Sequence, residues 1–447
     1  MSRCLVLGAR GYIGALLAPA LAAAGHSVRT MSRSLPPGPD AIRGDVRDPA
    51  ALAAAMSDVD VVFHLVHSMD VEDYAAVDAA IARAVAAAAA EAGVRQIVYL
   101  GGPAPADRPL SAHLASRTEV GDILLAGEVP ALVLRAAMVV GAGSASFELL
   151  ARAALVAPVV LRPAWMSHRS RPIAVRDVLF HLVRAAATEP VAGAVDIAGP
   201  DTVTYLELVQ RCARIAGLPW RVPVPVAAVP AAAAAALSPL PAPLVTALME
   251  SLKHDLVPES VLAPPPGGGT PLDRALREAL GVAEPPAMPS PREPGVLSTV
   301  NREPVAADQA ALWRTIADIG GERGWYGIPG VFTARGALDH LAGGVGLHRG
   351  RPATLSAGDA LDSWTVVSVE DRSLTLVTDM RMPGTAWLRL SALPGRVPGE
   401  SELEQTVVFV PRGVRGSLYW HVQKPAHDIV FGVMARGIAR AARSLVH

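Results

Sequence analysis

The segment Gly8-Ala9-Arg10-Gly11-Tyr12-Ile13-Gly14 is the strongest indication of fold in the first part of this chain. It follows the apolar run Cys4-Leu5-Val6-Leu7, which has the pattern of a buried strand. Three glycines spaced by three let the backbone turn sharply and leave the free N–H groups of the next helix facing an anion. Residues 15–24 supply that helix, and Gly25 is a natural residue to end it. The order of strand, glycine turn and helix predicts a site for the diphosphate of a nucleotide cofactor.

The residues that follow repeat the strand–helix alternation. Apolar runs predict strands at 27–31, 59–65, 96–100 and 131–140. Alanine-rich segments predict helices at 49–56, 77–92 and 110–125. This order is typical of an α/β fold of the Rossmann type, a doubly wound parallel sheet with helices on both faces. The carboxyl ends of its strands meet at one edge, where ligands bind.

Two arginines bear on which dinucleotide would be bound. An acidic residue about 20 positions beyond the glycines usually holds the ribose 2′-hydroxyl, whereas an arginine accommodates a 2′-phosphate. Here Arg33 stands near that position, and Arg10 lies inside the glycine turn. A guanidinium can offer two N–H donors to two phosphate oxygens. We therefore expect NADP(H) in preference to NAD(H); the alternative is that both arginines are solvated surface residues.

Composition excludes several classes of function. A chain of 447 residues predicts two or three domains, and a formal net charge of −1 gives no reason to expect a nucleic-acid partner. Cys4 and Cys212 match no metal or redox spacing, so we predict no metal site and a cytoplasmic protein. The oligomeric state is left open.

One apolar segment, residues 222–249, resembles a membrane span in composition. Its six prolines argue against a spanning helix, because proline breaks the backbone hydrogen bonding that such a helix needs. We expect a buried or groove-lining helical segment there. A peripheral membrane contact is the alternative that its apolar surface leaves open.

Composition changes at the proline-rich run 285–291. We therefore divide the chain into a nucleotide-binding domain, a linker and a second domain: 1–283, 284–300 and 301–447. Apolar runs in the last part predict an antiparallel sheet with strands at 361–369, 374–382, 386–393 and 403–410. Apolar residues at helical spacing from Ile429 to Ala441 predict a long final helix. A long helix laid into a curved sheet would enclose an apolar pocket.

Residues 2–280 resemble the short-chain dehydrogenase/reductase superfamily, in particular its extended and atypical NAD(P)-binding branches. Six segments carry this resemblance in the family's order: 8–14, 45–46, 60–65, 134–141, 172–178 and 196–199. The resemblance implies that the coenzyme is held by Gly8, Arg10, Gly11, Tyr12, Ile13, Gly14, Arg33, Asp45, Val46, Leu65 and Val66.

The sequence departs from this family at the catalytic pair. Where members carry Y-x-x-x-K, this chain has His113 and Arg117. The resemblance implies that His113 donates the proton and that Arg117 holds the ribose. Imidazole has an ordinary pKa of about 6.5, and a cation four residues along the helix would lower it further, which disfavours ordinary carbonyl reduction. The alternative is that His113 only hydrogen-bonds a loop. His67, Ser68, Asp70 and Glu72 follow the strand ending at Leu65 and are further candidates for contact with nicotinamide or substrate.

The last part of the chain, residues 324–447, resembles the START-related helix-grip domain appended to some atypical members. The carrying residues are 358–364 and 418–421. Such α+β folds generally hold hydrophobic ligands. Two functions follow as hypotheses: an NADP(H)-dependent oxidoreductase acting on a small hydrophobic molecule such as a quinone, lipid or polyketide-like ring, or a non-catalytic nucleotide-binding redox sensor or assembly factor.

Overall fold

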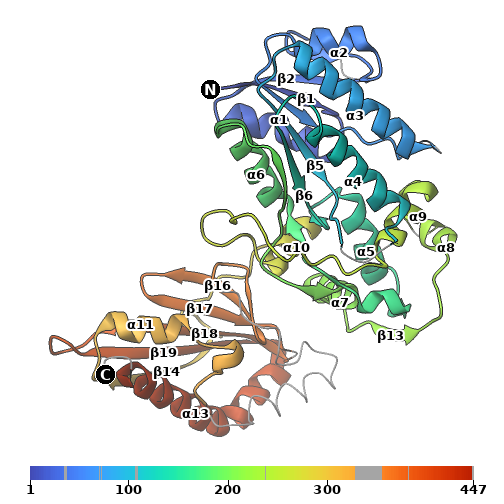
Figure 1. Cartoon of the computed structure of the whole chain (residues 1–447). Coiled ribbons are helices and arrows are strands. Elements are labelled where there is room, and N and C mark those ends of the chain that lie inside the picture. Colours follow the sequence, from blue (N-terminus) through green and yellow to red (C-terminus); the bar gives the residue numbers. More distant parts are fainter. Residues whose placement is uncertain are drawn as a thin grey trace. The chain divides into compact units, whose positions relative to one another are not determined.

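The computed structural model describes residues 1–34, 38–69, 71, 73–105, 109–236, 238–327, 355–380 and 382–444. The chain forms two compact units (Figure 1). The first contains residues 1–216 and 221–281, and the second contains residues 217–220 and 282–447. Each unit is described by itself below.

The first unit is built on a seven-stranded parallel sheet in the order β11-β6-β5-β4-β1-β2-β3. Its strands are β1 (Arg3–Leu7), β2 (Ser27–Ser32), β3 (Ala41–Arg43), β4 (Val61–His64), β5 (Gln96–Gly101), β6 (Ala131–Arg135) and β11 (Gly193–Asp196). The chain runs outward from β1 through β2 to β3, then crosses to β4 on the other side of β1. This reversal of strand order creates a crevice at the carboxyl ends of β1 and β4, where ligands of such sheets bind.

Apolar side chains point alternately to the two faces of the sheet along β1, which explains why helices cover both faces. Cys4 and Val6 pack in one cluster with helices α1 (Tyr12–Ala23) and α6 (Val175–Ala187). Leu5 and Leu7 point to the other face, where they pack with the remaining helices of the alternating repeat. These are α2 (Pro49–Met56), α3 (Tyr74–Glu91) and α4 (Ala112–Leu125). The predicted doubly wound α/β fold is confirmed, and α2 has the predicted bounds.

Two expected elements of the first unit are divided in the structure. The predicted strand 131–140 becomes β6 and the short strand β7 (Val139–Val140), which pairs with β10 (Ile173–Ala174) outside the main sheet. The segment 222–249 is not one helical element. It forms β13 (Val222–Pro225), α8 (Ala231–Ala236) and α9 (Ala242–Ser251), because its prolines interrupt backbone hydrogen bonding.

A group of short elements in the first unit follows β7. It contains α5 (Ala145–Leu155), β8 (Val159–Arg162), a 3₁₀ turn η1 (Ala164–Ser167), β9 (Arg169–Ser170), β12 (Val203–Thr204), α7 (Tyr205–Ile215) and α10 (Leu272–Leu280). In the described part of the chain, no helix has the length and apolarity needed to cross a membrane.

The second unit is an antiparallel sheet in the order β14-β19-β18-β17-β16-β15. The strands are β14 (Leu297–Val305), β15 (Ala360–Leu361), β16 (Trp364–Glu370), β17 (Ser373–Thr378), β18 (Gly384–Pro394) and β19 (Ser401–Pro411). Strand β14 begins inside the segment expected to be a linker, since residues from Leu297 pair with β19 in regular register. Residues 328–354 and 445–447 of the predicted second domain lie outside the described residues.

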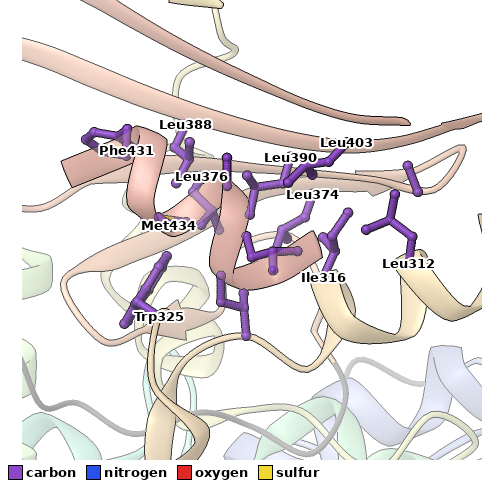
Figure 2. Close-up of a cluster of buried hydrophobic side chains, with 14 of the residues drawn as sticks. Leu312, Ile316, Trp325, Leu374, Leu376, Leu388, Leu390, Leu403, Phe431 and Met434 are labelled. Carbon is purple, nitrogen blue, oxygen red and sulfur yellow. The ribbon is translucent and has the colours of Figure 1, made fainter. Parts of the chain in front are cut away.

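Two helices accompany this sheet. The long helix α13 (Gly413–Ser444) was expected, whereas α11 (Gln309–Ala317) was not. Figure 2 shows their apolar side chains against the sheet: Leu312 and Ile316 come from α11, and Phe431 and Met434 come from α13. Leucines on the inward faces of β17, β18 and β19 complete this core. The predicted antiparallel sheet with a long final helix is therefore present.

Candidate functional site

A pocket of about 300 Å³ lies at the crevice between β1 and β4. Four loops line it, each following the carboxyl end of β1, β2, β3 or β4. The pocket brings together eight of the residues predicted to hold the coenzyme: Gly8, Arg10, Gly11, Arg33, Asp45, Val46, Leu65 and Val66. Strand order thus gathers residues that are separated by up to 58 positions in the sequence.

The glycine turn is required by close packing. Gly8 has φ +82°, and a Cβ there would lie 2.8 Å from the carbonyl oxygen of Leu65. Gly14 lies in the first turn of α1, and a Cβ there would overlap the carbonyl oxygen of Gly8 and lie 2.9 Å from the Cα of Ala9. Gly11 is the residue that precedes α1, so the first N–H groups of this helix face the turn. These features fit a diphosphate that approaches the backbone at the positive end of a helix.

Asp45 is held by an arginine that sequence reasoning did not select. Arg47 donates hydrogen bonds to Asp45 from its backbone N–H at 3.0 Å and from its Nη2 at 2.6 Å. These hydrogen bonds, opposed by partial burial, lower the pKa of Asp45 to about 2, and the charges of Arg47 and Arg33 add to the effect. Asp45 is therefore a carboxylate at neutral pH. The spacing of two residues between Asp45 and Arg47 is the local signal that could have identified this pair.

Tyr12 and Ile13 are outside the lining of this pocket. Both belong to the first turn of α1, and Ile13 packs partly buried against the apolar cluster on that face of the sheet. The ring of Tyr12 lies against Gly141 and Gly143, where a Cβ on Gly141 would overlap the hydroxyl oxygen. Burial raises the pKa of the Tyr12 phenol, so it remains protonated. The two glycines after β7 therefore make room for this ring.

A buried carboxylate supports the loop after β4. Asp78 on α3 is 4% exposed, and its Oδ2 lies 2.6 Å from Nδ1 of His67. Its Oδ1 accepts a hydrogen bond from the backbone N–H of Ser68 at 2.9 Å. Burial raises the pKa of Asp78, but the hydrogen bonds from His67 and Ser68 outweigh burial and hold it below its usual value. His67 and Ser68 line the pocket, so Asp78 fixes one of its walls; Asp70 and Glu72 lie outside the described residues.

His113 and Arg117 lie on α4, and neither is among the residues that line the pocket. The rings of His113 and His67 stack with centroids 5.4 Å apart. Burial, followed by the positive charge of Arg117, lowers the pKa of His113 to about 3. The imidazole is therefore neutral at neutral pH, and its Nδ1 is buried without a hydrogen-bond partner among the described residues.

The guanidinium of Arg117 is engaged with the end of β5. Its Nη2 donates a hydrogen bond to the carbonyl oxygen of Leu100, and its Cζ lies 5.1 Å from the centroid of the Tyr99 ring. Tyr99 also stacks on His64, with centroids 5.6 Å apart. Burial lowers the pKa of His64 to about 4. Sequence reasoning missed this layer of Tyr99 and His64, because both residues lie inside strands and read as core residues.

A larger polar cavity of about 710 Å³ lies beyond the ends of β6 and β11. Arg135 and Asp196 form an ion pair of 2.7 Å on its wall. Arg171 and His168 also line it, and Nδ1 of His168 lies 3.6 Å from the carboxylate of Asp255. Cations and anions alternate around this cavity, so it has no single sign of charge.

The second unit has an apolar cavity of its own, of about 500 Å³. Its wall includes Phe409 from β19 and Trp420 from α13, whose rings stack with centroids 5.5 Å apart. Two methionines, Met380 and Met382, add flexible apolar surface. Lys424 and His427 supply the polar edge. The cavity has the apolar character expected for a hydrophobic ligand.

Comparisons with known proteins divide the chain in the same way. Residues 4–120 match a family model described as the NAD dependent epimerase/dehydratase family. Residues 298–434 match a family described as a protein of unknown function, DUF2867. No curated protein shows a significant match to the chain.

Three solved structures illustrate the similarity to known folds. The enzyme WbmH of Bordetella bronchiseptica, in complex with NAD⁺, is 21% identical, with 51% of this chain and 85% of WbmH covered and a TM-score of 0.43. TunA, an NAD-dependent NDP-hexosamine 5,6-dehydratase involved in tunicamycin biosynthesis, is 19% identical, with coverages of 63% and 97% and a TM-score of 0.45. The UDP-N-acetylglucosamine 4-epimerase of Bacillus cereus is 17% identical, with coverages of 56% and 98% and a TM-score of 0.43.

The family match, residues 4–120, covers the glycine turn and strands β1 to β5 of the parallel sheet. The N-terminal unit thus contains a parallel sheet with a glycine turn whose residues 4–120 are similar to the NAD dependent epimerase/dehydratase family, and the C-terminal part matches a family of unknown function.

Proposed function

We propose that the protein is an NADP(H)-dependent oxidoreductase that acts on a small hydrophobic molecule. The observation that carries this proposal is the pocket at the carboxyl ends of β1 and β4, where the glycine turn, the N-terminus of α1 and two arginines, Arg10 and Arg33, line one cavity. The glycines and helix N-terminus fit a diphosphate, and the two guanidinium groups fit an additional phosphate monoester.

The bound coenzyme would supply or accept a hydride at its nicotinamide ring. Toward this chemistry His113 offers a neutral N–H donor to a developing oxyanion, because its low pKa keeps it from acting as a charged acid at neutral pH. Arg117 is a positioning residue: it holds the carbonyl oxygen of Leu100 at the end of β5, and its charge adds to the effect of burial in lowering the pKa of His113. A quinone or activated alkene suits this arrangement, since its reduction depends less on a protein acid.

The apolar cavity of the second unit supports the hydrophobic character of the substrate. Its aromatic and methionine lining would bury an apolar ring system, and a long helix beside an antiparallel sheet is the arrangement of the helix-grip domains that this part resembles. A direct test is the variant Ala386→Trp, which would fill this cavity from β18 and weaken binding of a co-purified apolar ligand identified by mass spectrometry. Thr385→Trp, whose side chain alternates to the other face of β18, is the matched control.

Calorimetry with NADPH and NADH tests the coenzyme. We expect tighter binding of NADPH, and a loss of about tenfold for each of Arg10→Gln and Arg33→Gln with NADPH only, from the loss of one charge-assisted hydrogen bond. Gly11→Asp should abolish binding of both coenzymes, because an N-terminal carboxylate is compatible with α1 but repels the diphosphate. Arg83→Gln on the surface of α3 is the control. If the wild type binds NADPH and NADH equally, and Arg10→Gln binds both as the wild type does, the NADP(H) preference is refuted.

A second function, a non-catalytic redox sensor or assembly factor, is favoured by two observations. The Arg117 guanidinium is engaged with the Leu100 carbonyl, and tyrosine and lysine are absent from the catalytic pair. NADPH oxidation measured with a panel of quinones and enones separates the two. Turnover supports the oxidoreductase, whereas tight binding of NADPH with no turnover across the panel supports the sensor.

A further inference from the structure

An exposed apolar face lies on the first unit, far along the sequence from the glycine turn. It consists of Leu155, Val156, Val159, Leu161, Val222 and Val224, which are 39% to 54% exposed; we call it the β8–β13 face. Strands β8 and β13 pair in parallel, with Val159 opposite Val222 and Leu161 opposite Val224. Residues opposite each other and two apart project from the same side of a ribbon, so the four side chains form one apolar surface.

This face continues into a cavity of about 340 Å³. Val156, Val159 and Leu161 belong to both, being exposed and also lining the cavity. The deeper wall is apolar and comes from helices α5, α8 and α9 and from η1: Leu149, Leu150, Trp165, Met166, Ala234 and Met249. An apolar cavity of this size can accept an apolar guest.

The charged side chains near this face are positive. Among the residues of strands β8 and β13 and of the cavity lining, the charged side chains are Arg152 and Arg162, and none is acidic; Glu148 on α5 and Glu250 on α9 are outside that lining. Both arginines are exposed, Arg152 at the cavity wall and Arg162 at the end of β8. The whole chain has a formal net charge of −1, so this local excess of positive charge is not a property of the average surface. Exposed apolar side chains flanked by arginine are typical of a surface that lies on anionic lipid.

We propose that the β8–β13 face docks on an anionic lipid bilayer and that the cavity behind it receives one hydrocarbon chain of a bilayer lipid. The apolar side chains then leave water at the level of the acyl chains, while Arg152 and Arg162 meet lipid phosphates. This inference concerns membrane association and holds whether or not the protein oxidises NADPH.

Co-sedimentation of the full chain with vesicles tests the docking. We expect binding to vesicles of phosphatidylcholine mixed with phosphatidylglycerol, and much weaker binding to phosphatidylcholine alone. Val222→Asp should reduce binding by at least about tenfold, because it places a carboxylate in the apolar layer. The control is Val191→Asp: Val191 is 52% exposed and Val222 is 54% exposed, but Val191 is outside the face. Equal binding by wild type and Val222→Asp, or an equal loss in Val191→Asp, would overturn the proposal.

The arginines are tested separately. Arg152→Gln combined with Arg162→Gln should weaken binding to the anionic vesicles by about thirtyfold, from about 1 kcal/mol per arginine near such a surface. Vesicle binding that does not respond to this double change would contradict the role of anionic lipid.

The cavity is tested by fluorescence, since Trp165 lines it. Lipids with brominated acyl chains should quench the emission of the bound protein, and Trp165→Phe should remove part of that quenching. Quenching that is the same with and without Trp165 would show that no hydrocarbon chain enters the cavity. Light scattering without lipid tests whether the face binds a second copy of the chain instead. A wild-type dimer that Val222→Asp converts to a monomer would assign the face to that contact. Unchanged NADPH affinity in Val222→Asp separates this result from failure of the coenzyme site.

Discussion

Oδ2 of Asp78 and Nδ1 of His67 lie 2.6 Å apart and join helix α3 to the loop after β4. This loop lines the proposed coenzyme pocket, and the His67 ring stacks in turn on His113. A single buried carboxylate therefore connects the pocket, through His67, with His113 on α4.

Asp78→Asn should loosen that connection. The substitution removes the charge from the hydrogen bonds to His67 and Ser68, so we expect the free energy of unfolding to fall by about 1–3 kcal/mol. NADPH affinity should fall as well, because residues of the loop line the pocket. Denaturant titration and calorimetry measure the two effects. Glu91→Gln, at the exposed end of the same helix, should change neither; if Asp78→Asn behaves like Glu91→Gln, the carboxylate does not hold the loop.

Gly14→Ala should damage the turn more than its small size suggests. A Cβ at this position meets the backbone of Gly8 and Ala9, which cannot move without opening the turn. We expect a loss of more than about 2 kcal/mol of stability together with loss of coenzyme binding. Gly25→Ala is the comparison, since φ there is +87° but no atom lies within 4 Å of a Cβ. That variant should lose only about 1 kcal/mol and bind coenzyme normally; similar behaviour of both variants would argue against the packing explanation.

His64 should make the protein less stable in acid. Burial lowers its folded pKa to about 4, whereas the unfolded chain takes up the proton near 6.5. Between these values the unfolded state binds more protons, so stability rises with pH and is lost as pH falls from 6.5 toward 4. The loss at pH 5 is about 2 kcal/mol relative to neutral pH. In His64→Phe, which keeps a ring against Tyr99, this part of the pH dependence should vanish. If the free energy of unfolding, measured by urea titration at each pH, changes with pH as in the wild type, His64 does not cause the dependence.

The pH dependence of turnover should identify how His113 acts. Because its pKa is about 3, the ring is neutral throughout pH 6 to 8, and the rate should not fall as pH rises through 6.5. His113→Ala should lower kcat by about 10²-fold, the effect of removing one oxyanion donor. A rate that drops above pH 6.5 in the wild type and not in His113→Ala would instead assign a protonated imidazole.

Much of the architecture was predictable because its signals are local. The run Cys4 to Leu7 and the glycines after it specify a strand and a tight turn through the sizes of adjacent side chains. Asp48 at the N-cap and Pro49 in the first turn specify the start of α2 in the same way, and its predicted bounds are those of the structure. Prediction failed for β14 and α11, where polar residues such as Glu303 and Gln309 interrupt the apolar pattern.

Local sequence patterns specify the alternating strands and helices, the diphosphate turn and the identity of its glycines, since these depend on backbone geometry over a few residues. The tertiary packing specifies which of the predicted residues line the pocket and which buried side chains support it. The crossing from β3 to β4 brings Leu65 against Gly8, and packing of α3 and α4 brings Asp78, His67 and His113 together. Burial and neighbouring charge at those positions, which no local pattern encodes, then set the protonation of the imidazole rings.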